Sequence, residues 1–481
     1  MNRRMVFYTI GQILLAEAAM LIIPALSALY FGESGWREFF ITAAVAAGIG
    51  FVLTFTKPEN RVIYAREGFA IVALAWVVLS VIGCLPFYIS GEIPRFENAL
   101  FETVSGFTTT GASILENIEG LSRCMLLWRS FTHWIGGIGV LFFVMAVIPL
   151  AGNRSIYLMR AELTGPVVDK IVPKMRDAAK IIYAIYIALT VIEIVLLLIG
   201  GMPLFDSVTH AFSTAGTGGF SVKNASIAAY GNPYFETVIT VFMILFGINL
   251  NLFYFLLIGN VRSVFKNEEL RAYVGIIIAA IAVVAINLMS VYESAGEALR
   301  YASFQVAAIL TTTGFATADY TTWPEFSKVI LLILMFCGAC AGSTTCSFKI
   351  ARVILLFRIL KREIRRLVHP RAVSTVKLGG KVIEDNVIIG TCAFLAVYIV
   401  IALASLLLLS VESFDFETRM TAVVACLNNI GPGFGKVGPS GNYALLSGFS
   451  KAVLMIDMLF GRLEIFPVLL TLAPATWRKR A

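Results

Sequence analysis

The chain has 481 residues, of which 58% are hydrophobic and only 14% are charged. This composition is too apolar for an ordinary soluble protein, and a mean hydropathy of +0.85 agrees with that. On such a chain a formal net charge of +8 records membrane orientation more often than nucleic-acid binding. We therefore expect an integral membrane protein in contact with lipid, with no nucleic-acid partner.

The cysteines and histidines do not indicate a catalytic or metal site. The seven cysteines are scattered through apolar surroundings, and an odd set is not a disulfide framework. Cys337, Cys340 and Cys346 lie close together, but no histidine is near them, so we expect them to pack in helices. A membrane-embedded enzyme needs a nucleophile with a base, or a metal site, and the three histidines supply neither. We expect no enzymatic activity and no cofactor.

The apolar segments follow a repeating order along the chain. Residues 5–30 and 37–56 are predicted to form two N-terminal spans, followed by a basic loop. A span, a short helix, a polar turn and a second span then recur four times. The predicted segments are the N-terminal spans at 1–66 and four pore repeats at 67–152, 153–265, 266–372 and 373–481.

Each repeat contains a short helix that is too short to cross a membrane. The predicted first spans are 67–90, 178–200, 270–292 and 386–410. The predicted short helices are 96–107, 205–213, 297–310 and 415–427. The predicted second spans are 123–150, 234–262, a long segment from 325, and 448–474.

Each short helix leads into a polar turn rich in Thr, Asn or Gly, and the chain is organised around these turns. Backbone at membrane depth must be satisfied by protein, water or ions, so we expect the turns to line a cavity. Glycine lets a chain turn its carbonyls inward, and rings of carbonyls replace the hydration shell of a cation in selectivity filters. The four turns are 108–113, 213–221, 311–317 and 428–435.

The basic loops predict the orientation. With ten spans, the basic stretches 153–180, 349–381 and 478–480 all fall on the side of the N-terminus. The positive-inside rule makes that side cytoplasmic, so both termini are expected in the cytoplasm. The turns then enter from outside, and the short helices direct the negative ends of their dipoles at a cation.

At these residues the chain resembles the TrkH/KtrB/HKT superfamily of potassium and sodium transport proteins, and its TrkH branch most closely. The motifs are Phe-Thr-Thr-Thr-Gly at 107–111, Thr-Thr-Thr-Gly-Phe at 311–315, Cys-Ala-Gly-Ser-Thr at 340–344 and Gly-Arg-Leu-Glu at 461–464. The resemblance implies an all-α integral membrane protein, with four pseudo-repeats of span, re-entrant pore helix, filter and span around a central pore. It also implies a homodimer in the bacterial cytoplasmic (inner) membrane and a cytosolic ring of nucleotide-binding subunits, using NAD or ATP, that gates the pore.

The resemblance assigns one filter glycine to each repeat. These glycines are Gly111, Gly218, Gly314 and Gly431. Alignment on Gly-Phe gives Gly219 and Gly433 instead in the second and fourth repeats, and both alignments stay open here. A glycine in all four repeats resembles the potassium-selective branch. The residues expected to hold potassium ions are Thr109, Thr110, Gly111, Thr217, Gly218, Gly219, Thr312, Thr313, Gly314, Asn429, Ile430 and Gly431.

Small polar residues at 338–347 interrupt the second span of the third repeat, which predicts a broken helix with a loop under the filter. In the family this loop obstructs the pore. Here Thr345-Cys346-Ser347-Phe348 stands where the family usually has further glycines, so movement of the loop alone is a weaker expectation. The alternative is a kinked helix whose hydroxyls bond its own carbonyls.

Arg462 lies inside an otherwise apolar helix, where a charge is costly unless it faces water or a partner. It either pairs with Asp457 or Glu464, or, as the resemblance implies, extends a positive charge into the path below the filter. The residues expected to take part in gating are Gly338, Cys340, Gly342, Ser343, Thr344, Lys349 and Arg462.

Three further expectations concern the ends of the helices. Arg129 and His133 are predicted to lie at the outer membrane interface with the neighbouring tryptophans. Glu102 and Asp415 are predicted to cap short helices. The basic tract 349–371 either records orientation or docks the cytosolic ring.

The predicted function is potassium-selective, channel-like uptake across the cytoplasmic membrane, driven by the membrane potential. The alternative is a symporter that couples potassium to sodium or protons. A carboxylate dedicated to coupling at mid-pore would favour symport, and the sequence assigns none there.

Overall fold

The computed structural model describes residues 2–55, 57–58, 64–139, 175–371 and 374–477. The predicted all-α membrane fold is confirmed. The described chain is helical except for loops and one antiparallel pair of strands, β1 (Lys377–Leu378) and β2 (Lys381–Val382). The predicted segment 140–150, most of the basic stretch 153–180 and the basic residues 478–480 lie outside the described residues.

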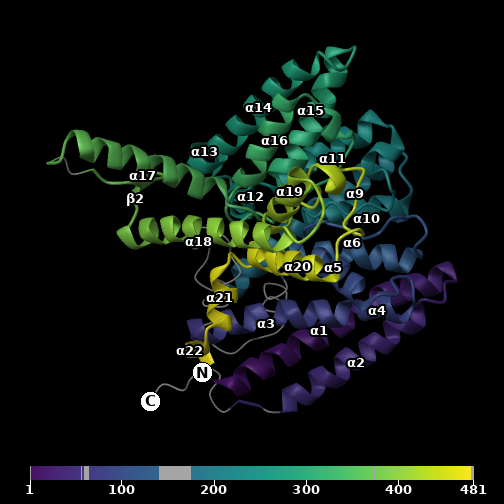
Figure 1. Cartoon of the computed structure of the whole chain (residues 1–481). Helices are drawn as coiled ribbons and strands as arrows, with labels where there is room; N and C mark the ends of the chain where they lie inside the picture. Colours follow the sequence, from purple (N-terminus) through teal and green to yellow (C-terminus); the bar gives the residue numbers. More distant parts are fainter. Residues whose placement is uncertain (1, 56, 59–63, 140–174, 372–373, 478–481) are drawn as a thin grey trace.

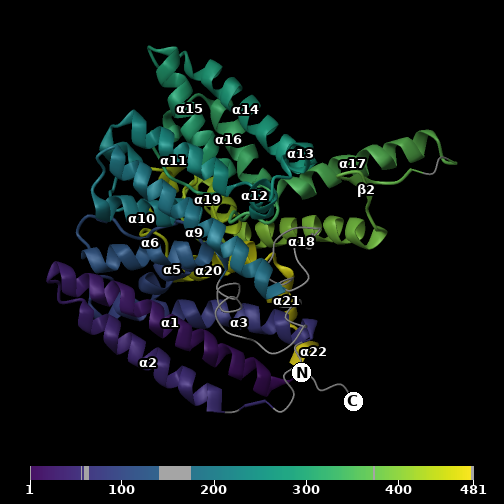
Figure 2. The same cartoon turned by 180° about the vertical axis from the view of Figure 1, so that it is seen from behind.

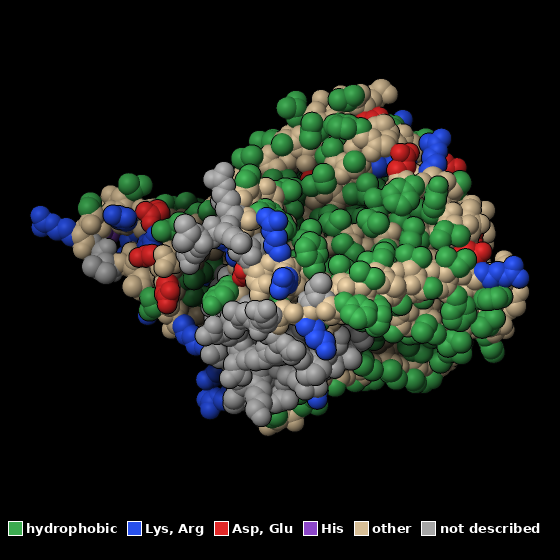
Figure 3. All heavy atoms as spheres, turned by 90° about the horizontal axis from the view of Figure 1, so that it is seen from below, with side chains coloured by type: hydrophobic (Ala, Val, Ile, Leu, Met, Phe, Trp, Pro, Cys, Tyr) green, Lys and Arg blue, Asp and Glu red, His purple; other side chains and the backbone are tan. Residues whose placement is uncertain are grey.

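The two N-terminal helices, α1 (Arg3–Phe31) and α2 (Trp36–Phe55), form a hairpin. Gly32 ends α1 in the left-handed conformation, with φ of 71°. A Cβ at Gly11 would overlap the Gly50 carbonyl, so the two helices meet at backbone distance. Much of α2 is exposed and apolar, as lipid contact requires, and hydrophobic side chains are spread over the described part of the face in Figure 3.

The four predicted repeats appear in chain order. The first contains α3 (Ala65–Gly83), α4 (Leu85–Ile89), α5 (Phe96–Phe107) and α6 (Arg123–Ile138). The second contains α9 (Met175–Ile199), α10 (Leu204–Ala215), η1 (Ser226–Tyr230), α11 (Pro233–Phe246), α12 (Leu250–Leu257) and α13 (Val261–Lys266).

The third contains α14 (Glu268–Leu288), α15 (Ala295–Leu310), η2 (Tyr320–Thr322), α16 (Glu325–Cys337) and α17 (Ile350–Val368). The fourth contains α18 (Asp385–Leu409), α19 (Phe416–Leu427), η3 (Gly435–Val437), α20 (Gly448–Arg462), α21 (Phe466–Leu472) and α22 (Pro474–Trp477).

In Figures 1 and 2, α1, α2 and α3 lie on one side of the molecule and α14, α15 and α16 on the opposite side. The short helices α5, α10 and α19 lie between these groups, and α17 projects with β2 beyond the body. Among the described residues, six helices are long and apolar enough to span a membrane, or seven if one bent pair is counted. The expected ten spans and the five segment boundaries stay predictions.

Two predicted continuous spans are broken, which corrects the sequence analysis. Segment 234–262 bends by 91° between α11 and α12, where Asn249 caps the second helix. Segment 448–474 breaks after Arg462, and Glu464 and Ile465 take positive φ of 54° and 64°. The predicted span 67–90 is recovered as one candidate span, Arg66–Ile89, although Cys84 separates α3 from α4. Hydropathy alone could not locate the first bend, because apolar residues surround it, whereas the charged residues Arg462 and Glu464 stand at the second break.

Candidate ion-conduction site

The short helices α5, α10, α15 and α19 all end in the same backbone motif. We define turn 1 as residues 108–113, turn 2 as 216–221, turn 3 as 311–316 and turn 4 as 428–433. In each turn the third residue donates its N–H to a carbonyl five residues back, at 2.9, 2.9, 2.8 and 2.9 Å. The second residue donates three residues back. These two bonds form a Schellman motif, so the four turns are equivalent in hydrogen bonding as well as in sequence.

The second residue of each turn is strained. Thr109, Thr217, Thr312 and Asn429 have φ of 55°, 53°, 55° and 53°. Left-handed conformation is tolerated by asparagine but is rare for β-branched threonine, and it persists only where the surroundings over-determine it. The same strain at the same position of three turns therefore marks this position as functional.

The fourth residue of each turn is a glycine with positive φ. Gly111, Gly219, Gly314 and Gly431 have φ of 78°, 77°, 77° and 92°. In the second repeat the equivalent glycine in backbone conformation is thus Gly219, one of the two that the sequence left open, rather than Gly218. In the fourth repeat it is Gly431, as first assigned, whereas Gly433 lies two residues further along the turn.

The four glycines close a ring. A Cβ at Gly111 would overlap the carbonyl oxygen of Gly218, the residue before the glycine of turn 2. In the same way Gly219 meets the carbonyl of turn 3, Gly314 that of turn 4, and Gly431 that of turn 1. Each turn therefore contacts the next in chain order, and the fourth returns to the first. Only glycine fits, because both the backbone conformation and the neighbouring carbonyl exclude a side chain.

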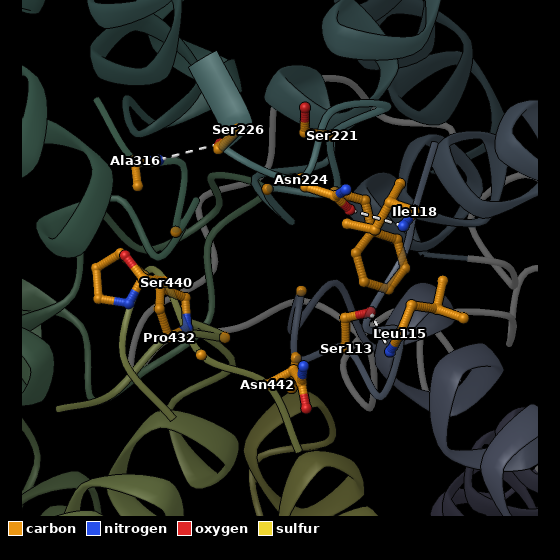
Figure 4. A pocket seen from close by; sticks show the side chains of 18 of the residues that line it. Ser113, Leu115, Ile118, Ser221, Asn224, Ser226, Ala316, Pro432, Ser440 and Asn442 are labelled. Carbon is orange, nitrogen blue, oxygen red and sulfur yellow. Dashed lines mark hydrogen bonds between the residues drawn. The ribbon is translucent and has the colours of Figure 1, made fainter. Parts of the chain in front are cut away.

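A cavity of about 160 Å³ opens on one side of this ring and is lined by the glycines of all four turns. Figure 4 shows residues of every turn around it, including Ser113, Ser221, Ala316 and Pro432. Beyond the ring the wall is held by hydrogen bonds between segments, such as Ile118 N–H to Asn224 Oδ1 at 2.7 Å. An ion approaching from this side would meet the backbone of all four turns at once.

The cavity side of turn 4 is held by tyrosines. Tyr443 donates its hydroxyl to the Gly431 carbonyl at 2.7 Å, and Tyr320 donates to the Gly433 carbonyl at 3.0 Å. Both tyrosines come from outside the turns, and the sequence analysis did not identify them. No motif surrounds either residue, so only their position in the fold shows what they do.

The predicted interfacial positions of Arg129 and His133 are wrong. Arg129 is 2% exposed and His133 is fully buried. His133 lies against Gly216 and Gly218 of turn 2 and stacks on Phe220 with ring centroids 4.1 Å apart. The signal in the sequence was Arg129, a charged residue inside a predicted span, because such residues face the interior of a helix bundle and are functional.

The predicted break in the third repeat is confirmed, since α16 ends at Cys337 and α17 begins at Ile350. We call residues 338–349 the intramembrane loop. Cys346 donates its N–H to the Thr312 hydroxyl at 3.2 Å, so the loop touches the strained position of turn 3. The loop also donates from Cys340 N–H to the Gly247 carbonyl and accepts from Leu250 N–H at the Gly342 carbonyl, both at 3.1 Å. These bonds explain the bend between α11 and α12.

Arg462 joins the loop to the ring. Its guanidinium donates to the Thr344 carbonyl at 3.1 Å, to the Gly137 carbonyl at 2.8 Å and to the Gly136 carbonyl. It also lies 3.4 Å from the Thr109 hydroxyl of turn 1. The alternative pairing with an acidic neighbour is not observed, since Asp457 accepts from Ser405 and Glu464 pairs with Arg352.

The remaining predicted gating residues lie in the same loop. Ser343 donates to the Cys340 carbonyl at 2.6 Å, and Lys349 is fully buried and donates to the Thr345 carbonyl. Lys349 has positive φ of 72°, like Gly338 and Gly342 at 65° and 76°. The structure thus brings the predicted gating residues together on the side of the ring opposite the cavity.

Comparison with known proteins identifies the family. The family model described as TrkH, a cation transport protein, matches residues 36–479. The chain belongs to the TrkH family. It is 36% identical to the Trk system potassium uptake protein TrkH of Salmonella typhimurium and to that of Escherichia coli K12, over 100% of each chain. It is 34% identical to TrkG of Escherichia coli K12 over 99% of each.

Among solved structures, the crystal structure of the potassium transporter TrkH from Vibrio parahaemolyticus matches with a TM-score of 0.89 and 33% identity. The match covers 99% of this chain and 100% of that one. The resemblance seen in the motifs is therefore confirmed. The relatives of this TrkH-family chain are bacterial and are named as transport proteins rather than enzymes, and its apolar helices make it a multi-pass membrane protein.

Proposed function

We propose that this chain conducts potassium selectively and in a channel-like way through the ring of four turns. The observation that carries the proposal is the closed ring in which each glycine meets the carbonyl of the next turn. Ring carbonyls would replace the hydration shell of potassium ions, which are cargo held in the filter and not a cofactor. Four pore helices ending at the ring add the negative ends of their dipoles. The relatives' names as potassium uptake proteins support the choice of ion.

The intramembrane loop and Arg462 form the gate in this proposal. The loop contacts turns 1 and 3, and the Arg462 charge lies beside Thr109 with no ion-paired acid among the described residues. A fixed positive charge on the path of a cation raises the barrier to its passage. Opening requires the loop and the guanidinium to move away from the ring.

The proposal extends to orientation and partners. The cavity in Figure 4 faces the outside, both termini face the cytoplasm, and the protein is a homodimer in the cytoplasmic membrane. A cytosolic nucleotide-binding ring of the Trk type, using NAD or ATP, docks on the basic helix α17, which projects from the body as an arm. That arm has a route to the gate, because Arg358 pairs with Glu268 while the next residue, Glu269, accepts the Ala341 N–H at 2.7 Å.

The test is cation flux into liposomes that contain the purified protein, comparing potassium, rubidium, sodium and lithium for wild type and Gly314→Ser. A carbonyl filter is supported if the wild type passes only potassium and rubidium and if Gly314→Ser either loses this flux or also passes sodium and lithium. Equal flux of all four ions in wild type contradicts selectivity. If no ion passes, adding the cytosolic ring with nucleotide must restore flux, and failure to do so contradicts the proposal.

Symport is the second candidate, and Glu193 is the observation that favours it. This carboxyl group on α9 is fully buried, and neither oxygen has a hydrogen-bond partner within the described residues. The neighbouring Thr214 hydroxyl donates instead to the His210 carbonyl at 2.9 Å. A buried carboxyl that gains and loses a proton would couple potassium to protons. Potassium flux that responds to a pH gradient in wild type but not in Glu193→Gln would select symport.

A further inference from the structure

Arg129 and Glu102 form a charged pair buried behind turns 1 and 2. Arg129 Nε lies 2.7 Å from Glu102 Oε1, and the side chains are 2% and 0% exposed. Removing two charges from water is costly, and the cost is offset only where both groups also bond elsewhere. The remaining contacts of the pair therefore show what it holds in place.

Glu102 holds turn 1. Its oxygens accept from the Ser113 hydroxyl at 3.0 and 3.2 Å and from the Ile114 N–H at 3.0 Å. Arg129 Nη2 reaches the same Ser113 hydroxyl at 3.3 Å. Ser113 lies two residues after the ring glycine Gly111, so these bonds fix the position from which turn 1 enters the ring.

The same guanidinium holds turn 2. Arg129 Nη1 donates to the Ser221 carbonyl at 3.0 Å, and the guanidinium carbon lies 3.8 Å from the centre of the Phe220 ring. Ser221 lies two residues after Gly219, which is the position equivalent to Ser113. One side chain therefore spans equivalent positions of adjacent turns and sets the distance between them.

The other repeats lack this arrangement. The residues equivalent to Glu102 on the pore helices are His210, Gln305 and Ala422, each six residues before its turn. His210 Nε2 lies 2.9 Å from the Ser221 hydroxyl, so turn 2 is held twice. Gln305 is fully buried, and its amide has no hydrogen-bond partner in the described chain, while Ala422 has no polar group. Polar side chains at this position thus hold turns 1 and 2 but not turns 3 and 4.

We infer that Arg129, held by Glu102, is a positioning residue that determines the preference for potassium over sodium. The inference rests on the proposed function, because it assigns the selectivity of the ring to a group behind it. Charge-assisted bonds from a planar guanidinium fix the spacing of two turns more firmly than neutral bonds can. A ring with fixed spacing cannot contract around the smaller sodium ion, so loss of Arg129 should favour sodium.

The experiment measures rubidium uptake, with sodium as competitor, in a potassium-uptake-deficient bacterium that expresses the full chain and retains its own cytosolic Trk subunits. The variants are Arg129→Gln, Arg129→Lys, the double variant Glu102→Gln with Arg129→Gln, and Ser113→Ala. Arg123→Gln is the matched control, because Arg123 lies on the same helix but is exposed. Thermal unfolding of each purified variant in potassium and in sodium salts separates lost selectivity from lost folding.

We expect Arg129→Gln to lower the ratio of rubidium to sodium preference about tenfold, the effect of losing one charge-assisted bond. Arg129→Lys and Ser113→Ala should shift the ratio in the same direction by less, and Arg123→Gln should not change it. In purified wild type, potassium should raise the unfolding temperature more than sodium does, and this difference should shrink in the variants.

Folded variants that keep the wild-type ratio and the wild-type difference in unfolding temperature overturn the inference. If Arg129→Gln does not accumulate, Ser113→Ala decides, since it removes one hydroxyl and leaves the charged pair in place. A wild type without any preference for potassium contradicts the proposed function itself, which is a different outcome from an unchanged ratio in the variants.

Discussion

The two sides of the ring are built from different kinds of contact. On the cavity side, Tyr443 and Tyr320 bond the carbonyls of turn 4 directly, and Arg129 holds turns 1 and 2. On the loop side, the ring is met by Arg462 at the end of α20 and by Cys346 in the intramembrane loop, which has no regular structure. Side chains on packed elements hold backbone in one place, whereas an irregular loop can exchange its hydrogen bonds more easily. The comparison indicates a fixed selectivity side and a movable gating side.

The largest expected effect comes from breaking the ring itself with Gly314→Ala. The new Cβ would overlap the Ile430 carbonyl at a φ of 77°, and left-handed strain alone costs about 1–2 kcal/mol. We expect potassium flux in liposomes to fall at least tenfold, on the order of that strain energy. Gly275→Ala on α14 is the control, because nothing lies within 4 Å of a Cβ there. Wild-type flux and selectivity in folded Gly314→Ala would contradict the glycine ring.

The next effect concerns the movable side. Arg462→Ala removes the guanidinium that joins Thr344, Gly137 and turn 1. Two charges 4 Å apart repel by about 4 kcal/mol at an effective dielectric constant of 20, so we expect leak without the cytosolic partner to rise at least tenfold. Rubidium efflux from loaded liposomes measures the leak. Arg271→Ala, at an exposed position, is the control. An unchanged leak in Arg462→Ala would show that the Arg462 charge is not a barrier to cation passage.

A smaller effect is expected where α14 meets the intramembrane loop. Glu269→Gln keeps an acceptor for the Ala341 N–H but removes the charge from a hydrogen bond of 2.7 Å. Charged hydrogen bonds are roughly twice as strong as neutral ones, so the loop should be released more easily. We expect basal leak to rise about threefold, since a few tenths to one kcal/mol is at stake. Glu293→Gln, at an exposed position, is the control and should leave the leak unchanged. An unchanged leak in Glu269→Gln would show that the contact between α14 and the loop has no role in gating.

The smallest effect lies at the edge of the fixed side. Asp415 caps α19, and the Thr418 hydroxyl and N–H, at 2.7 and 2.9 Å, hold the pKa of this carboxyl below its ordinary value of 3.8. Because the folded-state pKa is depressed, the stabilisation is present at neutral pH and is lost as pH falls below about 4. Asp415→Ala should cost about 1 kcal/mol at neutral pH.

Thermal unfolding at neutral and acidic pH checks this cap. The wild type should unfold at a higher temperature than Asp415→Ala at neutral pH, and the two should converge in acid. Glu417→Gln, an exposed neighbour on the same helix, should show no such convergence. A difference between wild type and Asp415→Ala that is independent of pH would show that the carboxylate charge is not what stabilises α19.

The predicted elements were recovered best where local pattern and tertiary role agree. The short helices at 96–107, 297–310 and 415–427 match α5, α15 and α19 within two residues. The break after Cys337 was recovered because small polar residues interrupt an apolar run there. The bend after Phe246 was missed, because Gly247 and Leu250 stand among apolar residues and their backbone groups bond the distant intramembrane loop.

The sequence by itself determined the membrane class, the repeated pattern and the residues of the four turns, because these follow from composition, hydropathy and local backbone preference. Only the tertiary structure decided between Gly218 and Gly219 as the equivalent of the other three turn glycines, because the two sequence alignments differ and the backbone angles distinguish them. Only the tertiary structure showed Arg129 behind two turns, because its partners, Glu102 on α5 and Ser221 in turn 2, come from separate parts of the chain. Contacts of that kind depend on packing between repeats, which no local pattern contains.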